Sequence, residues 1–198
     1  MENEITIQAE VGSEQVCQFA VNRSIYPGGA VYFATKESAQ GSPLAEKLFE
    51  IEDVVGIMVN ENVVKVTKAG SDDWMSIAKR IGTIIRTQLQ SGTPAISEKV
   101  EENLAPEDAI KEKIQMLFET EINPAVAMHS GNVELVDVKG NIVYLRLGGG
   151  CQGCGMADVT LKQGIEKAIR DVAPEVGEIL DVTDHAGGRN PYYSPEKK

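Results

Sequence analysis

The spacing of apolar and polar positions changes along the chain and predicts short strands that alternate with helices. In the first half, alternating apolar residues or short apolar runs indicate strands at 5–8, 16–21, 30–34, 54–59 and 63–68. A helix is expected from Pro43, because Ser42 can cap its free amides and proline suits the first helical position. A longer helix is expected after Asp72-Asp73 and before Ser91, since apolar residues recur there three or four positions apart.

The second half also mixes helices and strands, in a different order. Helices are expected at 106–121 and 156–172, and strands at 132–138, 141–147 and 178–182. Asn123-Pro124 should end or kink the first of these helices, because the residue before a proline avoids helical geometry. A tight turn around Gly140 should join the first two strands into a hairpin.

The stretch between the halves, residues 95–105, is polar and acidic and has no sustained period, so we expect it to be a linker. The sequence thus predicts an N-terminal domain at 1–94, a C-terminal domain at 106–183 and a flexible tail at 184–198. The expected fold class is α/β (α+β), with two small domains that each pack two helices on a short β-sheet.

Composition narrows the possible partners of the chain. It carries 30 acidic against 19 basic residues, a net charge of −11, and it has no Lys/Arg-rich run. Binding to nucleic acid or to an anionic membrane through bulk electrostatics is therefore not expected. The opening residues, MENEITIQAE, lack the basic and apolar segments of a targeting signal, and no stretch approaches ~18 apolar residues. We therefore expect a soluble, cytoplasmic protein.

Two of the three cysteines lie three positions apart in GGGCQGCG, residues 148–155, between a predicted strand and a predicted helix. Backbone amides at a helix start lack intrahelical partners, and the positive end of the helix dipole lowers the pKa of a nearby thiol. The surrounding glycines permit unusual backbone angles and let amides approach a sulfur closely. An anionic, sulfur-rich group would suit such a loop.

Three kinds of chemistry fit Cys151 and Cys154. A thioredoxin-like dithiol also places CxxC at a helix start, although no downstream proline loop is visible here. A structural zinc ion needs four ligands, which would require His129 and His185 at spacings unlike those of zinc fingers. An iron–sulfur cluster takes four thiolates, which two copies of the chain would supply around a two-fold axis. In the last case, the presence of only two thiols is itself a reason for the chain to dimerise.

The stretch GGGCQGCGMADVTLKQGIE, together with INPAVAMHSGNVELV and VKGNIVYLRL, resembles the signature of the Nfu-type iron–sulfur carrier domain, which is related to the C-terminal domain of NifU. The first half resembles the domain that precedes Nfu in many of these proteins, through GSPLAEKLFEIEDVVGIMVNENVVKVTK and the DDW that follows. The similarity covers nearly the whole chain. The chain departs from it at 129–131, where relatives often have two consecutive glycines and this sequence has Ser130 before Gly131.

The resemblance implies that the chain binds a [4Fe-4S] cluster between two copies of itself, with Cys151 and Cys154 as the thiolate ligands. It implies a homodimer bridged by the cluster, an upstream cluster-assembly machinery and apo iron–sulfur proteins as clients. The N-terminal domain is expected to serve targeting or docking. Neither histidine has a nucleophile and an orienting acid at a recognisable spacing, so we do not expect an enzyme.

The third cysteine and the two histidines are expected to have ordinary roles. Cys17 lies in the strand-like stretch QVCQFAV and should be a small buried hydrophobe rather than a ligand. His129 should be a turn residue, and His185 should be a solvated residue of the tail.

Overall fold

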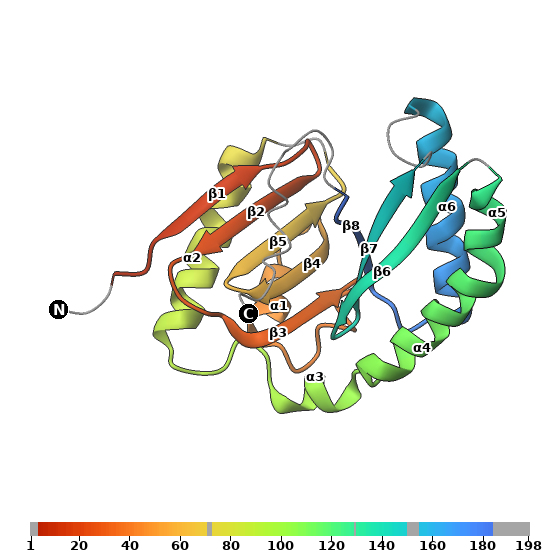
Figure 1. The fold of residues 1–198 in the computed structure, drawn as a ribbon. Coiled ribbons are helices and arrows are strands. Elements are labelled where there is room, and N and C mark those ends of the chain that lie inside the picture. The colour runs from red at the N-terminus through yellow and green to blue at the C-terminus, as the bar shows by residue number, and fades with distance from the viewer. Residues whose placement is uncertain (1–3, 71–72, 129, 150–154, 184–198) are drawn as a thin grey trace. The chain divides into compact units, whose positions relative to one another are not determined.

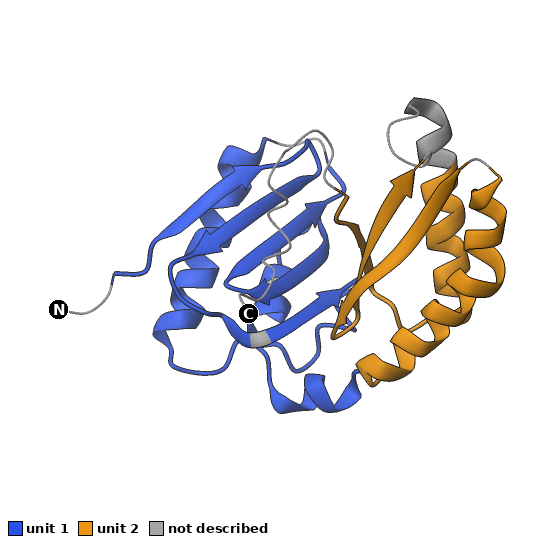
Figure 2. Cartoon of the chain, in the orientation of Figure 1, with its two compact units in different colours: residues 1–104 blue, residues 105–198 orange. Residues whose placement is uncertain are grey.

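The structure, a computed structural model, describes residues 4–70, 73–128, 130–149 and 155–183, and for 155–160 it describes the backbone alone. The chain divides into two compact units, residues 1–104 and 105–198, which Figure 2 colours separately. Each unit combines one β-sheet with helices, so the expected mixed α/β class is confirmed. Among the described residues, no helix is both long and apolar enough to cross a membrane.

The first unit holds a five-stranded antiparallel sheet with the strand order β1-β2-β5-β4-β3. Its strands are β1 (Ile7–Val11), β2 (Val16–Val21), β3 (Tyr26–Phe33), β4 (Val54–Glu61) and β5 (Val63–Lys68), and its helices are α1 (Pro43–Leu48), α2 (Trp74–Gln90) and α3 (Glu98–Asn103). Figure 1 shows α1 and α2 against one face of this sheet. Except for α3, these elements were expected, and the largest differences in their ends are at β1 and β3.

Helices α1 and α2 begin where local sequence rules place them. Ser42 caps α1, because its hydroxyl oxygen accepts the N–H of Ala45 at 3.2 Å. Asp73 caps α2 in the same way, with a carboxylate oxygen that accepts the N–H of Met75 at 3.2 Å. One side of α2 is then buried in the core of the unit through Trp74, Ile77, Ile81 and Ile85.

The segment predicted to be a linker, 95–105, differs from that expectation. Most of it folds with the first unit, because α3 lies within it and Ala95, Ile96 and Val100 are buried in the first core. The carbonyl oxygen of Ala95 accepts the Ser42 hydroxyl at 2.9 Å. Three apolar residues are too few to give a periodic pattern, and the partner that holds them lies 53 positions earlier in the chain.

The second unit contains a three-stranded sheet with the order β6-β7-β8. Its elements are α4 (Glu107–Leu117), the π-helical turn η1 (Phe118–Ile122), α5 (Asn123–Ala127), β6 (Gly131–Lys139), β7 (Ile142–Gly149), α6 (Gly155–Val172) and β8 (Glu178–Asp181). Strands β6 and β7 form an antiparallel hairpin, whereas β7 and β8 run parallel and are joined through α6 (Figure 1). A parallel pair needs such a crossover connection, and α6 supplies it.

The helix expected at 106–121 is longer and less regular than predicted. Helix α4 passes into η1 at Phe118, and α5 begins at Asn123 with Pro124 in its first turn. Proline has no N–H and clashes with the preceding helical turn. A π-helical turn is one of the irregularities at which a helix changes its bonding pattern. Asn123-Pro124 therefore marks a change in helical bonding, and helical backbone continues beyond it.

One face of the second sheet packs on α4 and α6. Val143, Leu145 and Leu147 of β7 all belong to this core, as the alternation of 143, 145 and 147 with their neighbours predicts. The same pattern predicts a half-buried strand, and this part is wrong, because Ile142 and Tyr144 are buried as well. Arg146, between Leu145 and Leu147, is exposed and pairs with Glu134 of β6 at 3.2 Å. The alternation thus anchors β7 in the core up to Leu147, two positions before the strand ends at Gly149.

Candidate functional site

The two thiols of the CxxC motif lie in a short connection between a strand and a helix. Cys151 and Cys154 fall outside the described residues, but the residues on both sides of them are described: β7 ends at Gly149 and α6 begins at Gly155. The segment 150–154 therefore leads from the carboxyl end of a strand to the amino end of an 18-residue helix. This agrees with the strand–loop–helix arrangement predicted from the sequence, and helix starts favour anionic groups.

The entrance to this segment is crowded. Gly149 pairs with Gly131 across β6 and β7. Its φ is +61°, a backbone conformation that residues other than glycine rarely adopt. A Cβ at Gly149 would overlap the backbone carbonyl oxygen of Ser130. A Cβ at Gly148 would meet only the side-chain amide of Asn132, which can move. Gly149 is therefore required both by its backbone angle and by the approach of the neighbouring turn.

The turn that approaches Gly149 contains a serine in an unfavourable backbone conformation. Ser130 has a φ of +56°, in the left-handed region that glycine adopts more readily. Its N–H donates to the carbonyl of Ala127 at 2.9 Å, which closes the end of α5. The two left-handed residues, Ser130 and Gly149, are neighbours across the hairpin end. This turn thus packs directly against the strand that leads to the thiols.

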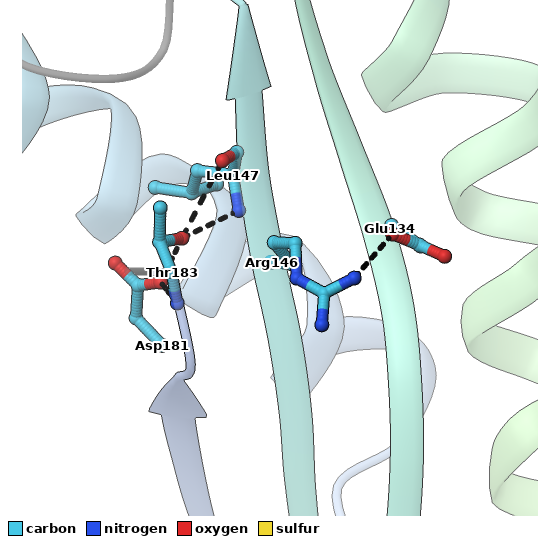
Figure 3. A network of polar contacts seen from close by, with 5 residues as sticks. All are labelled: Glu134, Arg146, Leu147, Asp181 and Thr183. Carbon is cyan, nitrogen blue, oxygen red and sulfur yellow. Dashed lines mark hydrogen bonds and ion pairs between the residues drawn. The ribbon is translucent and has the colours of Figure 1, made fainter. Parts of the chain in front are cut away.

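A buried threonine holds the end of β7. The Leu147 N–H donates to the Thr183 hydroxyl oxygen at 2.8 Å, and this hydroxyl in turn donates to the Asp181 carboxylate (Figure 3). Thr183 is 5% exposed, so these bonds form in a place where water cannot replace them. They extend the β7–β8 pairing beyond the end of β8 to a point two residues before Gly149.

The same aspartate holds the helix on the other side of the loop. Lys162 of α6 forms an ion pair with Asp181, with the ammonium nitrogen 2.7 Å from the second carboxylate oxygen. Asp181 therefore connects to β7 through Thr183 and to α6 through Lys162. Both elements that border the segment 150–154 are thus fixed to the end of β8.

Asn123 fixes the third element of the site. Its side-chain NH₂ donates to the Val133 carbonyl at 3.0 Å, and its side-chain oxygen accepts the Val133 N–H at 2.8 Å. This pair of bonds attaches the start of α5 to β6. The sequence showed Asn123 only as a helix terminator and gave no role to Thr183. The only sequence signals for these roles are weak: Asn123 is a polar residue before a proline, and Thr183 ends an Asp-x-Thr stretch at the end of a strand.

The remaining candidate residues do not join this site in the described structure. Cys17 lies in the core of the first unit with no exposed surface, and burial raises the pKa of its thiol, so the expectation of a small buried hydrophobe is confirmed. His129 and His185 lie outside the described residues. Within the ranges that the structure describes, no three His, Cys, Asp or Glu side chains gather where they could hold a metal ion.

The fold and the site define a two-domain protein whose second domain carries a CxxC motif between the end of a strand and the start of a helix. Residues 7–92 match the family model described as scaffold protein Nfu/NifU N terminal. Residues 114–180 match the model described as NifU-like domain. The two models thus cover the two units in the order that the sequence resemblance indicated.

A relative that matches almost the full chain shows the family. The Fe/S biogenesis protein NfuA of Stenotrophomonas maltophilia (strain K279a) is 36% identical over 184 residues, which are 87% of this chain and 89% of that protein. The chain belongs to this family of Fe/S biogenesis proteins, NfuA, with its Nfu/NifU N-terminal and NifU-like domains. The name of the family agrees with the expectation that the chain is not an enzyme.

Other similarities cover parts of the chain. The Fe/S biogenesis protein NfuA of Pseudomonas aeruginosa is 54% identical over 85 residues, so the match spans 42% of this chain and 44% of that protein's length. The solution NMR structure of a NifU-like protein from Saccharomyces cerevisiae covers 49% of this chain and 90% of its own, at 20% identity and a TM-score of 0.43. That structural similarity is too low to carry an argument.

Proposed function

We propose that this protein binds a [4Fe-4S] cluster through Cys151 and Cys154, shares it with a second copy of the chain and delivers it to apo-proteins. The observation that carries the proposal is the position of the thiols. Both lie in the segment 150–154 between the end of β7 and the start of α6. Membership in a family of Fe/S biogenesis proteins supports the choice of an iron–sulfur cluster over other sulfur chemistry.

The chemistry of the donors fits a cluster that needs a second chain. Thiolates are the ligands of iron–sulfur clusters, and four are needed. Free amides and the positive dipole end at the start of α6 favour the thiolate form. The motif offers two thiols, and Cys17, the remaining cysteine, is buried in the first unit. Two chains related by a two-fold axis would supply four equivalent thiolates.

Two alternatives use the same cysteines. A thiol–disulfide oxidoreductase would need them to cycle between dithiol and disulfide. A zinc-stabilised interaction module would need two further ligands such as His129 and His185. Neither alternative accounts for the match of both domains to Nfu/NifU models. The metal content distinguishes the three candidates: iron for the cluster carrier, zinc for the interaction module and no metal for the oxidoreductase.

A shared cluster suits delivery better than storage or electron transfer. Each pair of thiolates can be replaced by a pair from an acceptor, so the cluster can leave in steps, as in exchange at sulfur. The core of the second unit is formed by apolar side chains of α4, β6, β7 and α6. We therefore expect the apo-protein to remain folded after the cluster has left, unlike small proteins whose metal site holds the fold.

The test is the content of iron, acid-labile sulfide and zinc after anaerobic reconstitution, measured together with the molar mass in solution. We expect about four irons and four sulfides per dimer, a dimeric holo-protein and a largely monomeric apo-protein. Cys151→Ser and Cys154→Ser should each abolish the cluster, because two ligands per chain leave no redundancy. Cys17→Ser is the matched control and should retain it.

Specific results would exclude the proposal. Zinc in place of iron would favour the interaction module. A metal-free protein that reduces disulfides would favour the oxidoreductase. Cluster loss in Cys17→Ser, or a monomer with full iron, would contradict ligation by two thiols from each of two chains.

In this proposal the first unit serves as a docking domain for other proteins. It contains one buried cysteine and its own core, so its contribution to delivery would come through contacts with clients or with the upstream assembly machinery. The acidic chain and the absence of basic runs favour protein partners in the cytoplasm over nucleic acid or membrane surfaces.

A further inference from the structure

An uncharged region surrounds the end of the second unit that carries the thiols. One quarter of the chain is charged, yet residues 122–133 and 147–157 contain no Asp, Glu, Lys or Arg. The structure brings the described ends of the two stretches together, because Gly131 pairs with Gly149 and the Ser130 carbonyl lies against Gly149. The described residues that border the start of the CxxC segment, 130–133 and 147–149, thus carry no charged side chain in a chain of net charge −11.

One side of α5 forms an exposed apolar surface in this region. Pro124, Ala125, Ala127 and Met128 are all exposed, and we name them the α5 face. Met128 is 85% exposed, more than the other exposed methionines among the described residues, Met116 at 61% and Met75 at 71%. The opposite side of α5 is fixed, since Val126 is buried and the preceding Asn123 binds β6.

We propose that the α5 face is the apolar part of the interface with the second copy of this chain, flanking the shared cluster. The inference rests on the proposed function, because the cluster is what brings the two copies together. Met128 lies two residues before Ser130, which contacts Gly149, and Gly149 lies two residues before Cys151. A partner that supplies thiolates to the same cluster has to come close to this surface.

Area and charge both favour a second copy as the occupant. A stable interface buries about 800 Å² on each partner, which two five-residue loops around a cluster do not provide, so flanking surfaces have to contribute. Two chains of charge −11 repel each other, and the repulsion is smallest where neither presents a charge. In a two-fold dimer the same surface faces its copy, so an uncharged apolar face is self-complementary.

The test introduces a carboxylate at Met128 in the full-length, reconstituted protein. Met128→Glu would place two negative charges in the interface, one from each chain. We expect the dissociation constant of the holo dimer to rise about tenfold or more, which corresponds to about 1.4 kcal/mol, and the cluster to be lost faster to a chelator. Met116→Glu and Met75→Glu make the same change at other exposed methionines and should stay within about twofold of wild type.

A second pair of variants keeps the result interpretable. Met128→Leu should leave the dissociation constant of the dimer close to that of wild type, because it keeps the apolar surface. Met128→Gln should have a smaller effect than the glutamate and covers the case in which Met128→Glu fails to fold. A dimer that is unchanged in both polar variants overturns the inference. So does a variant with a normal dimer and impaired delivery to an apo-acceptor, since the surface would then serve the acceptor. A wild-type protein that holds no cluster, or holds it as a monomer, overturns the proposed function itself.

Discussion

Replacing Gly149 by alanine should destabilise the second unit strongly, although it adds a single methyl group. Three contributions decide the size. The left-handed φ of +61° costs a non-glycine residue about 1–2 kcal/mol. The new Cβ overlaps the Ser130 carbonyl oxygen, which belongs to the backbone and cannot rotate away, and such overpacking costs about 1–3 kcal/mol. Alanine restricts the unfolded chain, which offsets about 0.4–1 kcal/mol.

Together the three contributions give a loss of about 1–5 kcal/mol of unfolding free energy for Gly149→Ala. A loss of about 3 kcal/mol, the middle of that range, corresponds to roughly 10–25 °C in Tm for a unit of this size. Gly164→Ala is the matched control within the same unit. Gly164 lies in α6 with open space around it, so alanine there should stabilise the helix by about 0.5–1 kcal/mol. The same substitution is thus expected to have opposite signs at the two positions.

Urea titration of the apo-protein, followed by far-UV circular dichroism and by tryptophan fluorescence, measures both effects. Trp74 is the single tryptophan and belongs to the first core, so its fluorescence reports the other unit and should not change. Equal stabilities for Gly149→Ala and wild type would refute the reasoning, because neither backbone strain nor overlap would then be present. A loss in Gly164→Ala as large as in Gly149→Ala would show that the effect is not specific to the hairpin end.

Four further predictions concern the same unit. Ser130→Gly should stabilise it by about 0.5–1 kcal/mol, because the relief of the left-handed strain exceeds the entropy that glycine adds to the unfolded chain; a urea midpoint at or below that of wild type would contradict this. Thr183→Val should lower the free energy of unfolding by about 1–3 kcal/mol, because it leaves the buried Leu147 N–H without its acceptor. In the same urea titration, Thr183→Ser should retain most of the stability. Burial, with a smaller contribution from a nearby carboxylate, raises the pKa of Tyr144 from 10.0 to about 12. The folded state therefore keeps this proton to a higher pH than the unfolded state does, and the free energy of unfolding should fall as the pH rises from 10.0 to about 12. This loss should be absent from Tyr144→Phe. Residues 105–198 alone should still take up the cluster, measured as iron and sulfide per chain, and should deliver it to clients less selectively than the full chain; failure to reconstitute would show that the first unit takes part in the site.

The type and order of most elements, and the position of the thiols between a strand and a helix, could be predicted from local sequence patterns. Alternation in β7 and the i, i+3, i+4 spacing in α2 are local signals, since each depends on residues within one element. The caps at Ser42 and Asp73 are local for the same reason. The position of Cys151 and Cys154 between a strand and a helix follows from the same local patterns.

The contacts that hold the elements beside the CxxC segment together could not be predicted in this way, because they join residues far apart in the chain. The bond from Leu147 to Thr183 spans 36 positions, and the one from Ser42 to Ala95 spans 53, so no local period contains either. The second of these is why residues 95–104 fold with the first unit rather than forming a linker. Gly149 shows the limit most clearly. The setting of the thiols explains why glycines occur near them, but the overlap with Ser130 exists only because the hairpin brings two distant backbone segments into contact. The conformation of a residue is largely a local matter, whereas the space left for its side chain depends on residues that the fold, and not the chain order, places beside it.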